Sequence, residues 1–296
     1  NYLSNHIRVV GLAVMVMIIL TSLALAIWVI YYRENKVVKS SQPIFLLLIC
    51  FGTLVMSTAI LPLSIDDKIV SDRGCDISCM AMPWLLSVGF VLTFSALFSK
   101  ILKVNTIVQA SLRLDRIQLS LVDVLKPLVA LSLINLVLLL IWTLVDPWKW
   151  ETLAVLGTNK QNTYGACKAE GKASHIFITL ILLINFGSLM MTLVQAYKAR
   201  DIRDSISESK YIAIASVSWL EVFIIAVPLL FIVKGSKNAS YFLWLAIICV
   251  MCMSMLLLIF VPKIMMMRDS KSEEALGFSI FRKGTKLHQE SSRYKR

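Results

Sequence analysis

Hydrophobic residues fall into seven long runs that contain few charged side chains. A helix that crosses a bilayer needs about 20 apolar residues, and each run has roughly that length or more. Charged residues gather between the runs, and every proline except Pro228 lies at or near the end of a run, as is typical of helix ends. The pattern predicts an all-α membrane protein, a bundle of seven transmembrane helices over residues 7–32, 43–63, 82–108, 125–145, 174–197, 211–233 and 241–262.

Composition agrees with a membrane protein. Of the 296 residues, 58% are hydrophobic and 16% are charged, and the mean hydropathy is +0.77. A soluble domain carries about 25% charged residues. The net charge of +12 could suit nucleic acid, but cytoplasmic loops that meet anionic lipid are also basic. We therefore expect membrane lipid, and no nucleic acid, to be the partner of these charges.

The distribution of Lys and Arg predicts the orientation of the bundle. Twenty-one of the 30 lie near the loops after the first, third and fifth helices or in the C-terminal tail. These parts are expected in the cytoplasm, which places the N-terminus outside. The expected parts of this multi-pass membrane protein are an extracellular stub (1–6), a seven-helix domain (7–268) and a basic cytoplasmic tail (269–296). Because the chain starts with Asn1 rather than Met, we expect it to be a fragment.

Two features agree with this orientation. Asn238 begins an Asn-Ala-Ser glycosylation sequon in the last outside loop. Cys75, Cys79 and Cys167 all fall on the predicted outside, where disulfides persist. A bridge from Cys79 to Cys167 would hold the longest outside loop over the bundle and stabilise the fold, but Cys75 could compete for either partner.

Polar residues within or beside the helices are the other candidates for function. Lys100 and Glu208 lie at the inner ends of two helices, where they could pair and hold the bundle closed, or extend into water separately. Glu221 lies about 15 Å into the sixth helix, where an ionisable group usually faces a cavity or a partner. Asn185 and Asn135 are candidate partners for it, as hydrogen bonds between helices.

Motifs for catalysis and cofactor binding are missing from the sequence. It has no phosphate-binding glycine loop and no cluster of His and Cys with metal-ligand spacing, and its three histidines are scattered. We therefore expect neither an enzyme nor a resident cofactor or metal.

Five short motifs occur in order along residues 1–268. They are Lys39-Ser40-Ser41-Gln42-Pro43; Phe98-Ser99-Lys100 with Val104; Trp142 with Val145-Asp146-Pro147; Glu208-Ser209-Lys210-Tyr211-Ile212; and Phe260-Val261-Pro262-Lys263. In this order and at this spacing, the chain resembles class C G-protein-coupled receptors, and among them most the metabotropic GABA-B receptors.

The resemblance makes two of the candidate contacts specific. It implies a disulfide between Cys79 and Cys167, which leaves Cys75 over, and an ionic lock between Lys100 and Glu208. The chain also departs from the family, which has a lysine where Asn185 stands and an apolar residue where Glu221 stands.

The resemblance further implies a receptor that works as a homodimer or heterodimer. An agonist would bind a missing extracellular domain, and the seven-helix domain would pass the signal to a heterotrimeric G protein. Basic residues of the inner loops are the expected G-protein contacts: Lys103, Arg113, Arg116, Arg200 and Arg203. The alternatives are a seven-helix channel or transporter, with Glu221 on an ion path, and a partner subunit that does not couple to G proteins.

Overall fold

The computed structural model describes residues 3–112, 121–154, 163–198, 206–233 and 237–293, with side chains at most of these positions but none beyond Arg268. The elements are α1 (Asn5–Tyr31), α2 (Lys36–Ser40), α3 (Pro43–Ser57), α4 (Ile60–Leu63), α5 (Asp72–Leu112), α6 (Leu121–Val145), β1 (Lys149–Ala154), β2 (Thr163–Lys168), α7 (Ala173–Lys198), α8 (Ile206–Ile232) and α9 (Lys237–Arg293).

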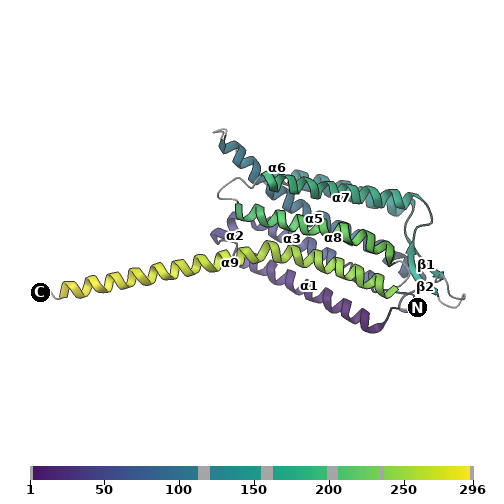
Figure 1. The fold of residues 1–296 in the computed structure, drawn as a ribbon, viewed down its shortest axis with the longest axis horizontal. Helices are drawn as coiled ribbons and strands as arrows, with labels where there is room; N and C mark the ends of the chain where they lie inside the picture. The colour runs from purple at the N-terminus through teal and green to yellow at the C-terminus, as the bar shows by residue number, and fades with distance from the viewer. Residues whose placement is uncertain (1–2, 113–120, 155–162, 199–205, 234–236, 294–296) are drawn as a thin grey trace.

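The long helices pack side by side in a bundle (Figure 1). In the described residues, six segments are long and apolar enough to cross a membrane: α1, α3 with α4, and parts of α5, α7, α8 and α9. The remaining long helix, α6, contains a shorter apolar stretch, Val129–Val145. The predicted all-α membrane bundle is therefore confirmed. The described residues also contain a small antiparallel hairpin of β1 and β2, which was not predicted from the sequence.

The N-terminus and the hairpin lie together at one end of the bundle, here called the hairpin end (Figure 1). The C-terminal part of α9 projects from the opposite end, here called the tail end. Because α9 is helical from Lys237 to Arg293, the predicted boundary between span and tail falls inside one helix.

Two prolines lie elsewhere in their helices than the sequence indicated. The third helix was expected from residue 82, with Pro83 in its first turn, but α5 begins at Asp72 and Pro83 is internal. Pro262 was expected at the end of a span and lies within α9. A proline inside a helix removes one backbone hydrogen bond, and a helix in a membrane tolerates it where neighbouring helices support the backbone.

The turn from α1 to α3 follows from local chemistry. Asn35 caps α2, because its Oδ1 accepts a hydrogen bond from the Val37 N–H (3.0 Å). Gln42 then adopts φ 56°, which turns the chain, and Pro43 occupies the first turn of α3. Proline suits that place because its missing N–H has no partner there in any helix.

Glycines allow α3 and α5 to approach closely. A Cβ on Gly89 would lie 2.6 Å from the backbone nitrogen of Met56, and one on Gly52 would lie 2.3 Å from Thr93 Oγ1. Small residues at such crossings are how transmembrane helices gain packing without a hydrophobic driving force.

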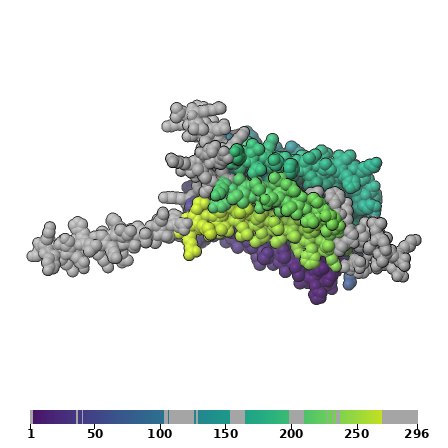
Figure 2. All heavy atoms as spheres, viewed as in Figure 1, coloured from purple at the N-terminus to yellow at the C-terminus, as the bar shows by residue number. Residues whose placement is uncertain are grey.

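Aromatic rings fill the centre between α5 and α8. The ring of Trp219 lies 4.8 Å from that of Phe90 and 5.3 Å from that of Phe94, centroid to centroid. Trp219 Nε1 also donates to the Met251 carbonyl (3.2 Å), which joins α8 to α9. Around this centre, α1, α9, α8 and α7 form a continuous surface (Figure 2). Large hydrophobic side chains remain exposed there, as expected of a face toward lipid: Leu23, Ile27, Leu183, Ile224, Ile225 and Leu257.

Candidate functional site

The hairpin is fastened to the first turns of α5. Cys79 and Cys167 form a disulfide, with their Cα atoms 5.5 Å apart. The Trp150 N–H donates to Asp76 Oδ1 (2.7 Å), one helical turn before Cys79. Cys75 is a free, buried thiol. The hairpin is thus held by a covalent bond and by a hydrogen bond to a carboxylate.

Asp146 connects the end of α6 to the start of α7. Its Oδ1 accepts from the Gly171 N–H (3.1 Å) and its Oδ2 from the Ser174 N–H (2.8 Å). Trp142 Nε1 donates to the Asp146 carbonyl (3.1 Å) and to Ser174 Oγ (3.0 Å). A carboxylate at the N-terminus of a helix accepts hydrogen bonds from N–H groups that lack partners within the helix, and its charge interacts favourably with the helix dipole. The tryptophan and aspartate of the third motif therefore position the helix that follows the hairpin.

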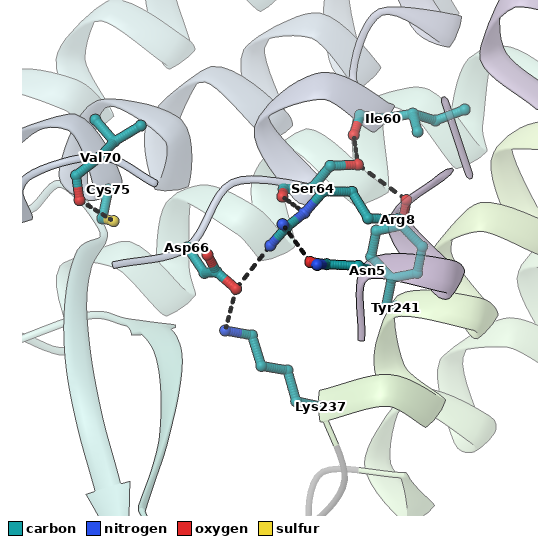
Figure 3. A network of polar contacts seen from close by, with 9 residues as sticks. All are labelled: Asn5, Arg8, Ile60, Ser64, Asp66, Val70, Cys75, Lys237 and Tyr241. Carbon is teal, nitrogen blue, oxygen red and sulfur yellow. Dashed lines mark hydrogen bonds and ion pairs between the residues drawn. The ribbon is translucent and has the colours of Figure 1, made fainter. Parts of the chain in front are cut away.

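A charged cluster ties α1, the turn after α4 and α9 together at the hairpin end (Figure 3). Asp66 Oδ2 lies 2.9 Å from Arg8 Nη2 and 3.9 Å from Lys237 Nζ, and the Asp66 side chain is 1% exposed. Arg8 Nε also donates to the Ser64 carbonyl (3.0 Å). Lys237 Nζ lies 4.7 Å from the centre of the Trp150 ring. We call Arg8, Asp66 and Lys237 the Asp66 cluster.

A second set of charges is buried at the tail end. Lys263 Nζ donates to Ser41 Oγ (2.8 Å), and these residues are 3% and 2% exposed. Lys100 is 5% exposed, and both lysines line one cavity together with Tyr211 and Pro262. Lysines are almost never fully buried unless paired. The motif residues Lys100, Tyr211 and Lys263, which come from three parts of the sequence, therefore meet around one cavity, and Ser41 from a fourth part binds Lys263.

The side chains of several predicted contact residues, among them Glu208, the expected partner of Lys100, are not described by the structure. The side chains of Glu208 and Lys103, and residues Arg113, Arg116, Arg200 and Arg203, lie outside the described part of the structure. The ionic lock between Lys100 and Glu208 and the G-protein contacts therefore stay predictions.

Of the three polar residues expected within the bundle, two are buried and one is exposed. Asn135 Oδ1 accepts from Ser87 Oγ (2.9 Å), which joins α6 to α5. Asn185 is buried and lines a second small cavity with Ser95 and Ser188. Glu221 instead has an exposed side chain on the outer surface of α8. The structure therefore does not bring Glu221 together with Asn135 or Asn185, its expected partners.

Asn238 lies in the first turn of α9 and is exposed. The sequence indicated a loop there, but the helix already begins at Lys237. Ser240 Oγ, in the same sequon, donates to the Val233 carbonyl (3.3 Å). Glycosylation of Asn238 stays a prediction.

The long helices and the disulfide-linked hairpin together make up a seven-helix membrane domain. Residues 2–263 match the model of the family described as "7 transmembrane sweet-taste receptor of 3 GCPR", the class C G-protein-coupled receptors. The chain belongs to this family, and it is a multi-pass protein of the plasma membrane.

Its relatives are receptors. Gamma-aminobutyric acid type B receptor subunit 2 of Rattus norvegicus is 24% identical over 249 residues, 80% of this chain and 26% of the relative. The subunit 2 of Caenorhabditis elegans is 23% identical over 79% of this chain and 28% of the relative. Metabotropic glutamate receptor-like protein E of Dictyostelium discoideum is 24% identical over 82% of this chain and 28% of the relative. The chain thus spans about a quarter of the length of these proteins.

Proposed function

We propose that this chain is the signal-transducing domain of a GABA-B-like class C receptor. An agonist binds an extracellular domain that lies outside these 296 residues, and the bundle relays the signal to a heterotrimeric G protein. The observation that carries this proposal is the meeting of three separate motif residues, Lys100, Tyr211 and Lys263, at one cavity of the tail end, where Lys263 also binds Ser41 of a fourth motif. The family membership and the receptor names of the relatives support it.

In this proposal the hairpin end faces outside and the tail end faces the cytoplasm. The excess of Lys and Arg near the tail-end loops supports that orientation. The disulfide at the hairpin end supports it as well, because disulfides persist in oxidising compartments.

Nucleotide exchange on purified heterotrimeric G proteins tests the relay. The chain is reconstituted in nanodiscs, and exchange is measured with and without a second receptor subunit. Lys100→Ala opens the tail end by removing the ionic lock, so basal exchange should rise. Exchanging the charges, with Lys100→Glu and Glu208→Lys together, should lower it again. If neither variant changes exchange, the lock is wrong; if the chain never stimulates exchange under any condition, the relay is wrong.

The proposed dimer forms along α8. Glu221 is exposed on this helix, and Ile224 and Ile225 are 62% and 60% exposed. An ionisable side chain facing lipid is expensive, so a second transmembrane helix that offers a polar contact would lower its free energy. Cysteine cross-linking tests this contact: Ile224→Cys should yield covalent dimers, and Leu183→Cys, an exposed position on α7, should not. Equal cross-linking at both positions would indicate random collision.

Two other functions remain to be separated from this one. A channel or transporter was favoured by Glu221 as part of an ion path, but Glu221 lies on the outer surface and lines neither of the two cavities described above. Flux of protons or substrate into liposomes that is abolished by Glu221→Gln would nevertheless replace the receptor proposal. A subunit that supports assembly without coupling would show exchange only in the presence of its partner subunit.

A further inference from the structure

The Asp66 cluster has an unusual charge balance. One buried carboxylate faces two cations, and both contact the same oxygen, Oδ2, at 2.9 Å and 3.9 Å. Among the described atoms, the other oxygen, Oδ1, is buried and accepts no hydrogen bond. Without the negative charge of Asp66, Arg8 and Lys237 would face each other as like charges in a partly buried place, which is strongly unfavourable. Asp66 therefore holds together two helix ends that would otherwise repel.

A second contact holds α9 to the turn after α4 beside the cluster. Tyr241, in the second turn of α9, shares a hydrogen bond of 2.9 Å with Ser64 Oγ. Its ring lies against α1 at Gly11, where a Cβ would be 1.8 Å from the Tyr241 hydroxyl. Glycine at this position leaves room for the Tyr241 ring. Figure 3 shows Tyr241 and Ser64 beside the Asp66 cluster.

The same helix carries the buried contact of the tail end. Lys263, which donates to Ser41, lies about 39 Å along α9 from Lys237, at a rise of about 1.5 Å per residue. Between these points α9 stays packed, since Cys252 Sγ contacts the Thr53 carbonyl of α3 (3.8 Å) and the Met251 carbonyl accepts from Trp219 of α8. A continuous, packed helix transmits a displacement of one end to the other.

We propose that the Asp66 cluster acts as a strut. By holding the hairpin end of α9 in place, it sets where the same helix lies at the tail end. Asp66 is a positioning residue: by fixing the hairpin end of α9 to α1, it keeps Lys263 against Ser41 at the tail end. A pull on the N-terminal end of α1 separates Arg8 from Asp66, frees α9 and loosens the contact at the far end. Only the source of that pull rests on the proposed receptor function, since the strut itself is a property of the described helices.

Thiol labelling of the tail end tests the strut without any G protein. Met267 is 7% exposed and Met265 is 60% exposed, two residues apart at the tail end of α9. Met267→Cys therefore reports opening of the tail end, and Met265→Cys reports labelling of an exposed site. Labelling of each with a maleimide is measured in nanodiscs and corrected for the chain without the added cysteine. Asp66→Asn removes the central charge, and Asp67→Asn is the matched control because Asp67 is the exposed neighbour, whose charge acts on Lys237 only from beyond ion-pair distance.

Asp66→Asn should raise the labelling rate at position 267 by about fivefold or more, the lower range of coupling between distant sites. Asp67→Asn should leave it unchanged, and position 265 should label equally in all backgrounds. Should Asp66→Asn fail to fold in a thermal unfolding check, Lys237→Gln replaces it, because it leaves a neutral pair of Arg8 and Asp66 and should still raise labelling at 267. Unchanged labelling at position 267 in the folded variants overturns the strut, whether or not the chain activates a G protein.

Discussion

Replacing Gly89 with alanine should destabilise the bundle, and the size of the effect follows from the crossing of α3 and α5. The added Cβ would lie 2.6 Å from the Met56 nitrogen and 2.8 Å from the Gly52 carbonyl oxygen, both of them backbone atoms that no rotamer change can move. Ordinary contact begins near 3.4 Å, so the two helices must separate by several tenths of an ångström. Such overpacking costs about 1–3 kcal/mol.

Gly187→Ala is the matched control for this substitution. A Cβ on Gly187, within α7, meets no described atom within 4 Å. Alanine there only removes the helix penalty of glycine, about 0.5–1 kcal/mol. The same chemical change is thus expected to stabilise at position 187, whereas at position 89 the overpacking outweighs this gain.

Thermal unfolding with a thiol-reactive dye measures both variants. Cys50 and Cys252 are free thiols, 1% and 0% exposed, and react only when the bundle opens. Gly89→Ala should lower the melting temperature, and Gly187→Ala should leave it equal or higher. If both variants lower it by the same amount, the close helix crossing does not determine stability and the reasoning is refuted.

Three further outcomes are expected. Replacing Cys79 and Cys167 with serine should lower the free energy of unfolding by about 3 kcal/mol and alter tryptophan fluorescence at the hairpin; identical unfolding of the parent with and without reductant would contradict this. Asp146→Asn weakens the bonds to two backbone N–H groups at the start of α7, so it should cost about 1–3 kcal/mol, measured by the same dye. Glu221→Gln removes an ionisable group from the lipid-facing surface of α8, so it should leave the free energy of unfolding equal or higher, but should reduce cross-linking through Ile224→Cys; a large loss of stability would place Glu221 inside the bundle.

The spans could be predicted because length and apolarity alone make a helix cross a bilayer. Which face of each helix points inward could not be predicted, because a transmembrane helix is apolar toward its neighbours and toward lipid alike, so its pattern carries no direction. Glu221 illustrates this: its depth follows from counting residues, but its exposure on α8 depends on how the helix is rotated in the bundle.

The Asp66 cluster could not be predicted for a different reason. Arg8 and Asp66 are 58 residues apart, and Lys237 is far beyond both. No local pattern pairs them, and each one alone resembles an ordinary loop charge. The hairpin was missed because its strands are short and lie in the longest polar loop, although the Thr, Trp and Tyr residues around β1 and β2 favour strands. The tail-end cavity, in contrast, gathers residues that the motifs had already singled out.

The continuity of α9 has a thermodynamic consequence that runs in both directions. If a ligand of the hairpin end changes the affinity for a ligand of the tail end through the position of α9, then the tail-end ligand changes the affinity for the hairpin-end ligand by the same factor. A partner of the tail end would then alter how tightly the hairpin end holds its own partners without ever touching them.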